Sequence, residues 1–190
     1  MKSQLKNGQF TLSEHEIERL IEYAGTLRDR TMIKLLCFCG LRREEVVSIE
    51  IKNIDWDRRR LRIIGKGDKD RTIPVPRQVL TDMKFLIGTP KQTYLFPAKN
   101  RKNHHLAPVQ LNRILAAAGE AAGIRNPNPK LKTINPHSLR HSFVKALKTK
   151  GVNLEVIQNI LGHKSFKTTV ETYGILTIDD IQEKFEEAIA

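Results

Sequence analysis

The sequence predicts an α+β domain that is mainly helical and carries one small antiparallel β-sheet. Apolar residues recur at helical spacing in most segments of the chain. Among these segments, two short apolar runs flank a loop of glycine, lysine and aspartate, a pattern typical of a β-hairpin. With 190 residues, the chain is long enough for one sizeable domain with a real core.

A short leader precedes the first predicted helix. We expect residues 1–9 to be flexible and residues 10–190 to form the domain. Ser13 and Glu16 have the spacing of a capping box. Apolar residues follow at helical spacing, at Ile17, Leu20, Ile21 and Ala24.

The second predicted helix runs from Arg28 to Cys39 and is apolar around much of its girth, which predicts burial. Gly40 marks its end, and a short helix starts near Arg43. Cys37 and Cys39 lie two positions apart, so they point in different directions and a mutual disulfide is not expected. We interpret them as reduced, buried thiols of a cytoplasmic protein. They do not predict a metal site, because no second cysteine pair completes a tetrahedron.

The predicted hairpin pairs residues 60–64 with residues 71–75 through a loop at 65–70. Pro74 lacks a backbone N–H, which indicates a short strand or one at the edge of the sheet. Later helices are expected over residues 78–87, 109–122, 137–150, 154–161 and 178–189. The chain contains no run of about 18 apolar residues, so no membrane span is predicted.

Charge is unevenly distributed along the chain. The formal net charge is +12. Residues 171–190 hold six carboxylates against Lys184, a net of −5, which leaves +17 on residues 1–170. A basic body of this kind favours a polyanionic partner, most often nucleic acid, although a solvated basic surface that aids solubility is the alternative.

A basic cluster opens the helix predicted near residue 137. His137, Arg140 and His141 stand at positions i, i+3 and i+4, which share one helix face. They lie in the first turn, where free backbone N–H groups favour an anion, and Pro136 helps to fix the helix start. Three basic side chains there suit a phosphate, although an exposed basic face is the plainer interpretation of this motif alone.

Arg42 follows the glycine at the end of the buried helix, where an arginine needs an anionic partner. Glu45, three residues on, could orient its guanidinium, or the two could form a simple ion pair within a helix. Arg43 is the second choice for the anion-binding arginine.

Further candidates lie in predicted loops. Lys66 stands between two glycines, which let a loop approach a ligand closely. Lys66, Lys69 and Arg71 could equally form a generic basic tip, and a second basic loop contains Lys99, Arg101 and Lys102. We predict that these residues contact DNA phosphates.

The order of these motifs, from Gly-Leu-Arg-Arg-Glu-Glu at 40–45 through Gly-Lys-Gly, His-Ser-Leu-Arg-His and Leu-Gly-His to Tyr173, resembles the catalytic domain of the tyrosine recombinases. The resemblance spans residues 10–190. It implies that the family's catalytic residues correspond to Arg42, Lys66, His137, Arg140, His163 and Tyr173, with Glu45 and His141 in supporting roles.

The resemblance also implies a function. Tyr173 would attack a phosphodiester of double-stranded DNA, form a 3′-phosphotyrosyl link and free a 5′-hydroxyl that Lys66 protonates. No metal and no other cofactor is expected. The family works as a tetramer on DNA, and its C-terminal helix, here 178–189, commonly docks on a neighbouring protomer. The segment could equally pack on its own domain.

Two departures from the family stand out. Only about nine residues precede the first helix, so we expect the family's N-terminal core-binding domain to be absent. Gly174 follows the nucleophile, where the family often has a polar residue. The alternatives to a recombinase are a type IB topoisomerase, which shares this chemistry, and a DNA-binding regulator that does not cleave.

Overall fold

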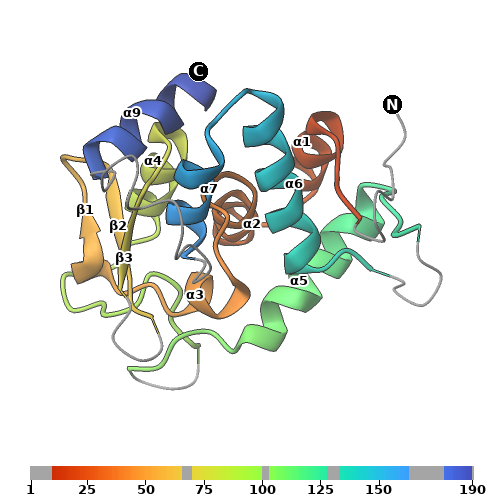
Figure 1. Ribbon diagram of the computed structural model, residues 1–190. Coiled ribbons are helices and arrows are strands. Elements are labelled where there is room, and N and C mark those ends of the chain that lie inside the picture. Colours follow the sequence, from red (N-terminus) through yellow and green to blue (C-terminus); the bar gives the residue numbers. More distant parts are fainter. Residues whose placement is uncertain (1–9, 66–69, 100–102, 128–132, 163–177, 190) are drawn as a thin grey trace.

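The protein is described here by a computed structural model (Figure 1). The structure describes residues 10–65, 70–99, 103–127, 133–162 and 178–189. The helices are α1 (Glu14–Glu22), α2 (Leu27–Cys39), α3 (Arg43–Val47), α4 (Arg77–Phe85), α5 (Pro108–Ala121), α6 (Pro136–Thr149), α7 (Leu154–Leu161) and α9 (Ile178–Ile189). A 3₁₀ turn at Ile51–Asn53 leads into the sheet. The mainly helical α+β class predicted from the sequence is confirmed.

The sheet lies at one side of the molecule (Figure 1). Its strands are β1 (Ile54–Asp55), β2 (Arg60–Ile63) and β3 (Arg71–Pro74), paired antiparallel in the order β1-β2-β3. Leu61 pairs with Ile73 in the centre of the hairpin, and both are fully buried. Pro74 sits on an edge strand of this sheet, as its missing N–H predicts. The hairpin was predicted, but β1, with two residues, was not.

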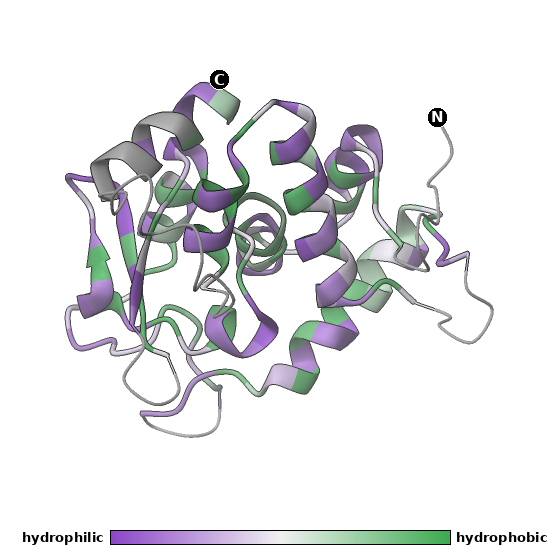
Figure 2. Ribbon diagram, in the orientation of Figure 1, coloured by the Kyte–Doolittle hydropathy of each residue, from purple (hydrophilic) through white to green (hydrophobic). Residues whose placement is uncertain are grey.

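Helix α2 forms the centre of the helical part. It packs against α1, α3, α4, α5 and α6. Its residues Met32, Ile33, Leu35 and Leu36 are fully buried on more than one side of the helix, which confirms the burial predicted from its apolar girth. Each such side chain contributes about 1.5–3 kcal/mol through burial. The surrounding helices α1, α6 and α7 carry both hydrophilic and hydrophobic stretches (Figure 2).

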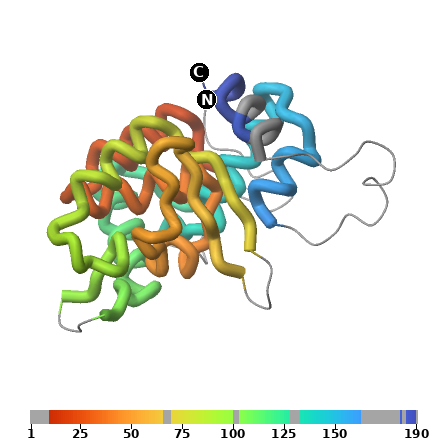
Figure 3. Tube along the Cα trace, turned by 90° about the vertical axis from the view of Figure 1, so that its left-hand side faces the viewer, coloured from red at the N-terminus to blue at the C-terminus, as the bar shows by residue number. Residues whose placement is uncertain are grey.

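Figure 3 shows the blue helices α7 and α9 together on one side, with the yellow strand β3 between them and the red and orange elements. Helix α9 packs on β3 and α7 of its own domain. Phe185 anchors it with 1% exposure, and Arg59 pairs with Glu186 at its rim.

The helix ends follow local chemistry. The predicted capping box of α1 is confirmed, since the backbone N–H of Ser13 donates to Glu16 and that of Glu16 donates to the Ser13 hydroxyl. Helix α6 begins with Pro136 at its first position, and Asn135 caps it by accepting from the backbone N–H of Ser138. The sequence interpretation had not assigned that cap.

Other sequence-based expectations concern the cysteines and membrane spans. Cys37 and Cys39 are free and buried, and burial raises the pKa of both thiols. Among the described segments, no helix is both long and apolar enough to span a bilayer.

Candidate active site

Arg42 stands at the junction between the end of α2 and the start of α3. Gly40 ends α2 in the left-handed conformation (φ 61°), and Arg42 occupies the N-cap of α3. Glu45 accepts a hydrogen bond from the Arg42 backbone N–H at 2.7 Å and another from Arg42 Nη1 at 2.9 Å. The Arg42 side chain remains 41% exposed, so its guanidinium can also reach an external anion. Arg43 instead pairs with Glu44 at the surface.

Glu45 is shared between two arginines. Arg71 places its fork on this carboxylate, with Nη1 at 2.9 Å from Oε1 and Nη2 at 2.8 Å from Oε2. Burial by itself would raise the pKa of Glu45, but hydrogen bonds from Arg71 and Arg42 outweigh it and lower the pKa to about 2. Glu45 is therefore an anion at neutral pH, held between two cations.

Arg140, the second basic residue of the motif, lies in α6 and is buried, with 7% exposure. Its Nη1 donates to the carbonyl of Gly40, and its Nη2 donates to the carbonyl of Leu161 at 2.8 Å. Burial and the nearby charge of Arg42 lower the pKa of Arg140 to about 10, so it stays protonated at neutral pH. The exposed basic face considered from the sequence is wrong for Arg140, because carbonyls at the ends of two helices hold it inside.

The two histidines of the motif differ in surroundings. His137 is exposed at the start of α6, whereas His141 is half-buried one turn later. Burial, followed by the charges of His137 and Arg140, lowers the pKa of His141, which favours its neutral form. His137 is thus the more accessible of the two to a ligand.

Arg71 lies elsewhere than the sequence interpretation expected. Its side chain is only 11% exposed, and its three nitrogens donate to Glu45 and to the carbonyl of Ile160. With these donors engaged inside the protein, Arg71 is not part of an exposed basic tip, and the DNA contact predicted for it stays a prediction. The signal that was missed is the spacing of two residues, which puts Arg71 on the same side of the extended chain as the buried Ile73 and Val75.

The hairpin is fastened beside its loop. Asp70 accepts from Arg62 Nη2 at 2.6 Å and from the backbone N–H of Gly65 at 3.2 Å.

Several predicted site residues lie outside the described residues, namely Lys66, Lys69, Arg101, Lys102, His163 and Tyr173. Lys99 is described and is exposed, consistent with a phosphate contact.

The described site is therefore built from Arg42, Glu45, Arg71 and Arg140. Two of its guanidiniums are predicted to bind phosphate, that of Arg42 at the N-cap of α3 and that of Arg140 in α6. Within the described part of the chain, no cluster of three or more His, Cys, Asp or Glu residues could hold a metal ion. What the site offers chemically is fixed positive charge for an oxyanion.

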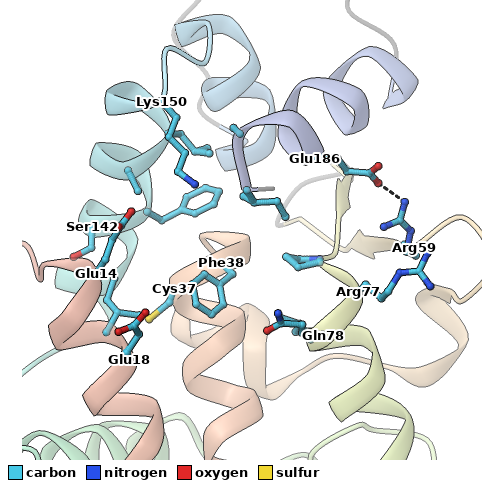
Figure 4. Close-up of a pocket in the computed structure, with 18 residues that line it drawn as sticks. Glu14, Glu18, Cys37, Phe38, Arg59, Arg77, Gln78, Ser142, Lys150 and Glu186 are labelled. Atoms are coloured by element: carbon cyan, nitrogen blue, oxygen red, sulfur yellow. Dashed lines mark hydrogen bonds and ion pairs between the residues drawn. The ribbon is translucent and has the colours of Figure 1, made fainter.

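A separate hollow of about 620 Å³ opens between α1, α2, α4, α6 and α9 (Figure 4). Glu14 and Glu18 lie on one side of it, and Arg59 and Arg77 lie on the other, where Arg59 points toward Glu186. None of the four residues of the arginine site lines it.

Known proteins resemble this chain over most of its length. Residues 11–177 match the model of the phage integrase family. The chain is 37% identical to the tyrosine recombinase XerA of Pyrococcus furiosus, over 94% of this chain and 61% of that protein. It is 33% identical to the tyrosine recombinase of Pseudothermotoga lettingae, over 90% of this chain and 57% of that protein.

Solved structures of similar fold include recombinases and integrases. A crystal structure of XerA recombinase has a TM-score of 0.70 at 29% identity and covers 93% of this chain and 64% of its own. The integrase of mycobacterium phage Brujita has a TM-score of 0.76 at 26% identity and covers 99% and 59%. The chain spans about three fifths of the length of the relatives it matches. On these findings the chain belongs to the phage integrase family, with the fold of the tyrosine recombinase catalytic domain.

Proposed function

We propose that this chain is the catalytic part of a site-specific DNA recombinase that cleaves and rejoins DNA through a 3′-phosphotyrosyl intermediate. The observation that carries the proposal is the pair Arg42 and Arg140, which the N-terminus of α3 and helix α6 bring to one site. Arg42 is held there by Glu45, and Arg140 by the carbonyls of Gly40 and Leu161. A structure of similar fold, that of XerH at 27% identity and a TM-score of 0.67, is bound to its difH substrate.

The proposed reaction begins with the phenol of Tyr173. Its oxygen attacks the scissile phosphorus while a base, His137 in our assignment, takes the phenolic proton. The bond to the 5′-oxygen breaks, and Lys66 gives that oxygen a proton. Arg42 and Arg140 hold the non-bridging oxygens, and His163 adds a hydrogen bond.

The second step reverses the first. A 5′-hydroxyl of a partner strand attacks the phosphotyrosine, reforms a phosphodiester and releases Tyr173. One ester is exchanged for another in each step, so the reaction needs no nucleotide cofactor. Because Arg42, Arg140 and Lys66 supply positive charge, it needs no metal ion either.

Replacing Tyr173 tests this reaction. Tyr173→Phe removes only the hydroxyl, so DNA binding should persist while covalent protein–DNA adducts disappear on a nicked suicide duplex. Tyr94→Phe is the matched control, since Tyr94 packs against the ring of His105 and is not among the residues assigned to catalysis, and it should cleave normally. Adducts formed by Tyr173→Phe would reject Tyr173, and binding without any wild-type adduct would favour a regulator that does not cleave.

Transfer to a second strand separates a recombinase from a topoisomerase. Joining of the cleaved strand to a different duplex supports recombination, whereas relaxation of supercoiled DNA without strand exchange supports a type IB topoisomerase.

We also propose that α9 mediates assembly on DNA. In this structure it packs on its own domain through Phe185 and the Arg59–Glu186 pair, so docking on a neighbour would exchange these contacts for equivalent ones. Sedimentation with a four-armed junction should give a complex of four protomers. Independent binding of single protomers at every concentration would contradict this proposal.

A further inference from the structure

We propose that Arg71 is a positioning residue, which fixes Glu45 and through it the guanidinium of Arg42. This inference rests on the proposed function, because Arg42 is the group assigned to the scissile phosphate. Arg71 itself makes no contact with the reacting atoms in this proposal.

The first argument is the geometry of the contact. Arg71 holds both oxygens of Glu45 in a two-pronged hydrogen bond, with distances of 2.9 and 2.8 Å. The same two oxygens accept from Arg42, Oε1 from its Nη1 and Oε2 from its backbone N–H. A carboxylate held in this way has one orientation, so it presents Arg42 in one orientation.

The second argument is burial. The side chains of Arg71 and Glu45 are 11% and 12% exposed, whereas that of Arg42 is 41% exposed. The two groups nearer the interior support the one that can reach an external anion. A surface ion pair would confer little order, but a buried fork on a carboxylate fixes both partners.

The third argument is the anchor of Arg71 itself. Its Nε donates to the carbonyl of Ile160 at 2.8 Å, in the last turn of α7. The neighbouring carbonyl of Leu161 accepts from Arg140 at 2.8 Å. Cations at the C-terminal end of a helix are favoured by its dipole, so the end of α7 holds both arginines at a set separation.

The space around Arg71 agrees with this anchor. Gly162 ends α7 in the left-handed conformation, and a Cβ there would lie 2.8 Å from Cδ of Arg71. Arg71 therefore passes directly beneath the glycine that precedes His163. Because β3 begins at Arg71, the same residue also ties the base of the hairpin, whose loop carries Lys66, to α3 and α7.

A lysine cannot reproduce these contacts. Its single ammonium group offers three donors at one point, whereas Arg71 spreads three donors from the carbonyl of Ile160 to both oxygens of Glu45. Arg71→Lys therefore keeps the charge and removes the fork. Arg62→Lys is the matched control, since Arg62 lies on the same hairpin and pairs with Asp70 but is 61% exposed.

The test measures single-turnover cleavage of a nicked suicide duplex at saturating DNA, together with the affinity for that duplex. Arg71→Lys should slow cleavage about a hundredfold, the cost of misplacing a catalytic group by about 1 Å. Its affinity should change little, and Arg62→Lys should cleave within about fivefold of the wild type. Loss of affinity with an unchanged saturated rate would make Arg71 a DNA contact and overturn the proposal.

A double-mutant cycle separates positioning from general stability. In an Arg42→Ala background the target of positioning is gone, so adding Arg71→Lys should slow cleavage by no more than about fivefold. A full hundredfold loss in both backgrounds would show that Arg71 acts independently of Arg42, and the proposal would fail.

Hydrogen exchange of the Arg42 amide tests the positioning role without depending on cleavage. The Arg42 amide donates to Glu45, so its hydrogen exchange should quicken at least about tenfold in Arg71→Lys, as expected when a bond to a charged group loosens. The Leu106 amide, which donates to Phe96, should exchange as before. A wild type that forms no adduct would reject the proposed function alone, whereas an unchanged Arg42 amide would reject the positioning role.

Discussion

Substitution of Gly40 tests how tightly the junction before Arg42 is built. Gly40 ends α2 with φ of 61°, a conformation that side chains with a Cβ adopt at a cost. A Cβ at this position would lie 2.5 and 2.6 Å from two carbons of the Phe143 ring. Phe143 is buried and packs against Phe185 with ring centroids 6.3 Å apart, so the ring has little room to retreat.

The expected loss has two parts. The left-handed backbone costs about 1–2 kcal/mol for alanine. Forcing an extra methyl into a packed core adds about 1–3 kcal/mol. Gly40→Ala should therefore lower the free energy of unfolding by about 2–5 kcal/mol.

Gly151 provides a control with the same backbone and no obstruction. It has φ of 78°, and a Cβ there would have no neighbour within 4 Å. Gly151→Ala should cost only the backbone part, about 1–2 kcal/mol. Urea unfolding of the wild type and both variants measures the difference. Equal losses in the two variants would refute the packing argument and leave only the backbone term.

Three further predictions concern acid, salt and metal. The pKa of Glu45 in the folded protein, about 2, lies below its ordinary value of 4.5. The ionised carboxylate therefore adds about 3 kcal/mol to the free energy of unfolding above pH 4.5, and this contribution is lost as the pH falls toward 2. The stability gap between wild type and Glu45→Gln, measured by urea unfolding, should therefore shrink from pH 7 to pH 2.5; a constant gap would contradict the assigned titration. The logarithm of the affinity for DNA should fall with the logarithm of the salt concentration, with a slope near 0.9 per phosphate neutralised. The protein should bind its own site less than about a thousandfold more tightly than a random duplex. Titrations of specific and scrambled duplexes at two salt concentrations check both numbers. Adduct formation should persist in excess EDTA, and restoration by magnesium after its loss would reject the charge assignment to Arg42, Arg140 and Lys66.

Local patterns predicted most of the secondary structure, because each signal acts within a few residues. The capping box at Ser13, the terminating Gly40 and the apolar girth of α2 each determine structure near themselves. Strand β1 was not predicted, because a strand of two residues shows no periodicity in the sequence. The spacing of Arg42 and Glu45 predicted their contact, and the family resemblance selected Arg42 over Arg43.

Contacts between distant segments could not be predicted from spacing. Glu45 and Arg71 are 26 positions apart, and Arg140 meets the carbonyl of Gly40 across 100 positions. Arg71 follows a loop rich in lysine, so its sequence neighbours suggest a surface residue. Only the pairing of β3 in the sheet places its side chain inside. Likewise, the apolar side of α9 predicts packing, and only the folded chain shows that β3 and α7 provide the surface.

The charge of the described site suits a transition state better than a ground state. Arg42, Arg71 and Arg140 contribute three positive charges and Glu45 one negative charge, which leaves +2. A phosphodiester carries −1, and the pentavalent species in the proposed reaction approaches −2 once a phenolate has joined it. Glu45 lowers the positive charge of the site, so its contribution in the proposed reaction is positional, because it orients its two arginine partners. Because the carbonyls of Gly40, Ile160 and Leu161 hold this arrangement before DNA arrives, the remaining excess is already in place as charge develops at phosphorus.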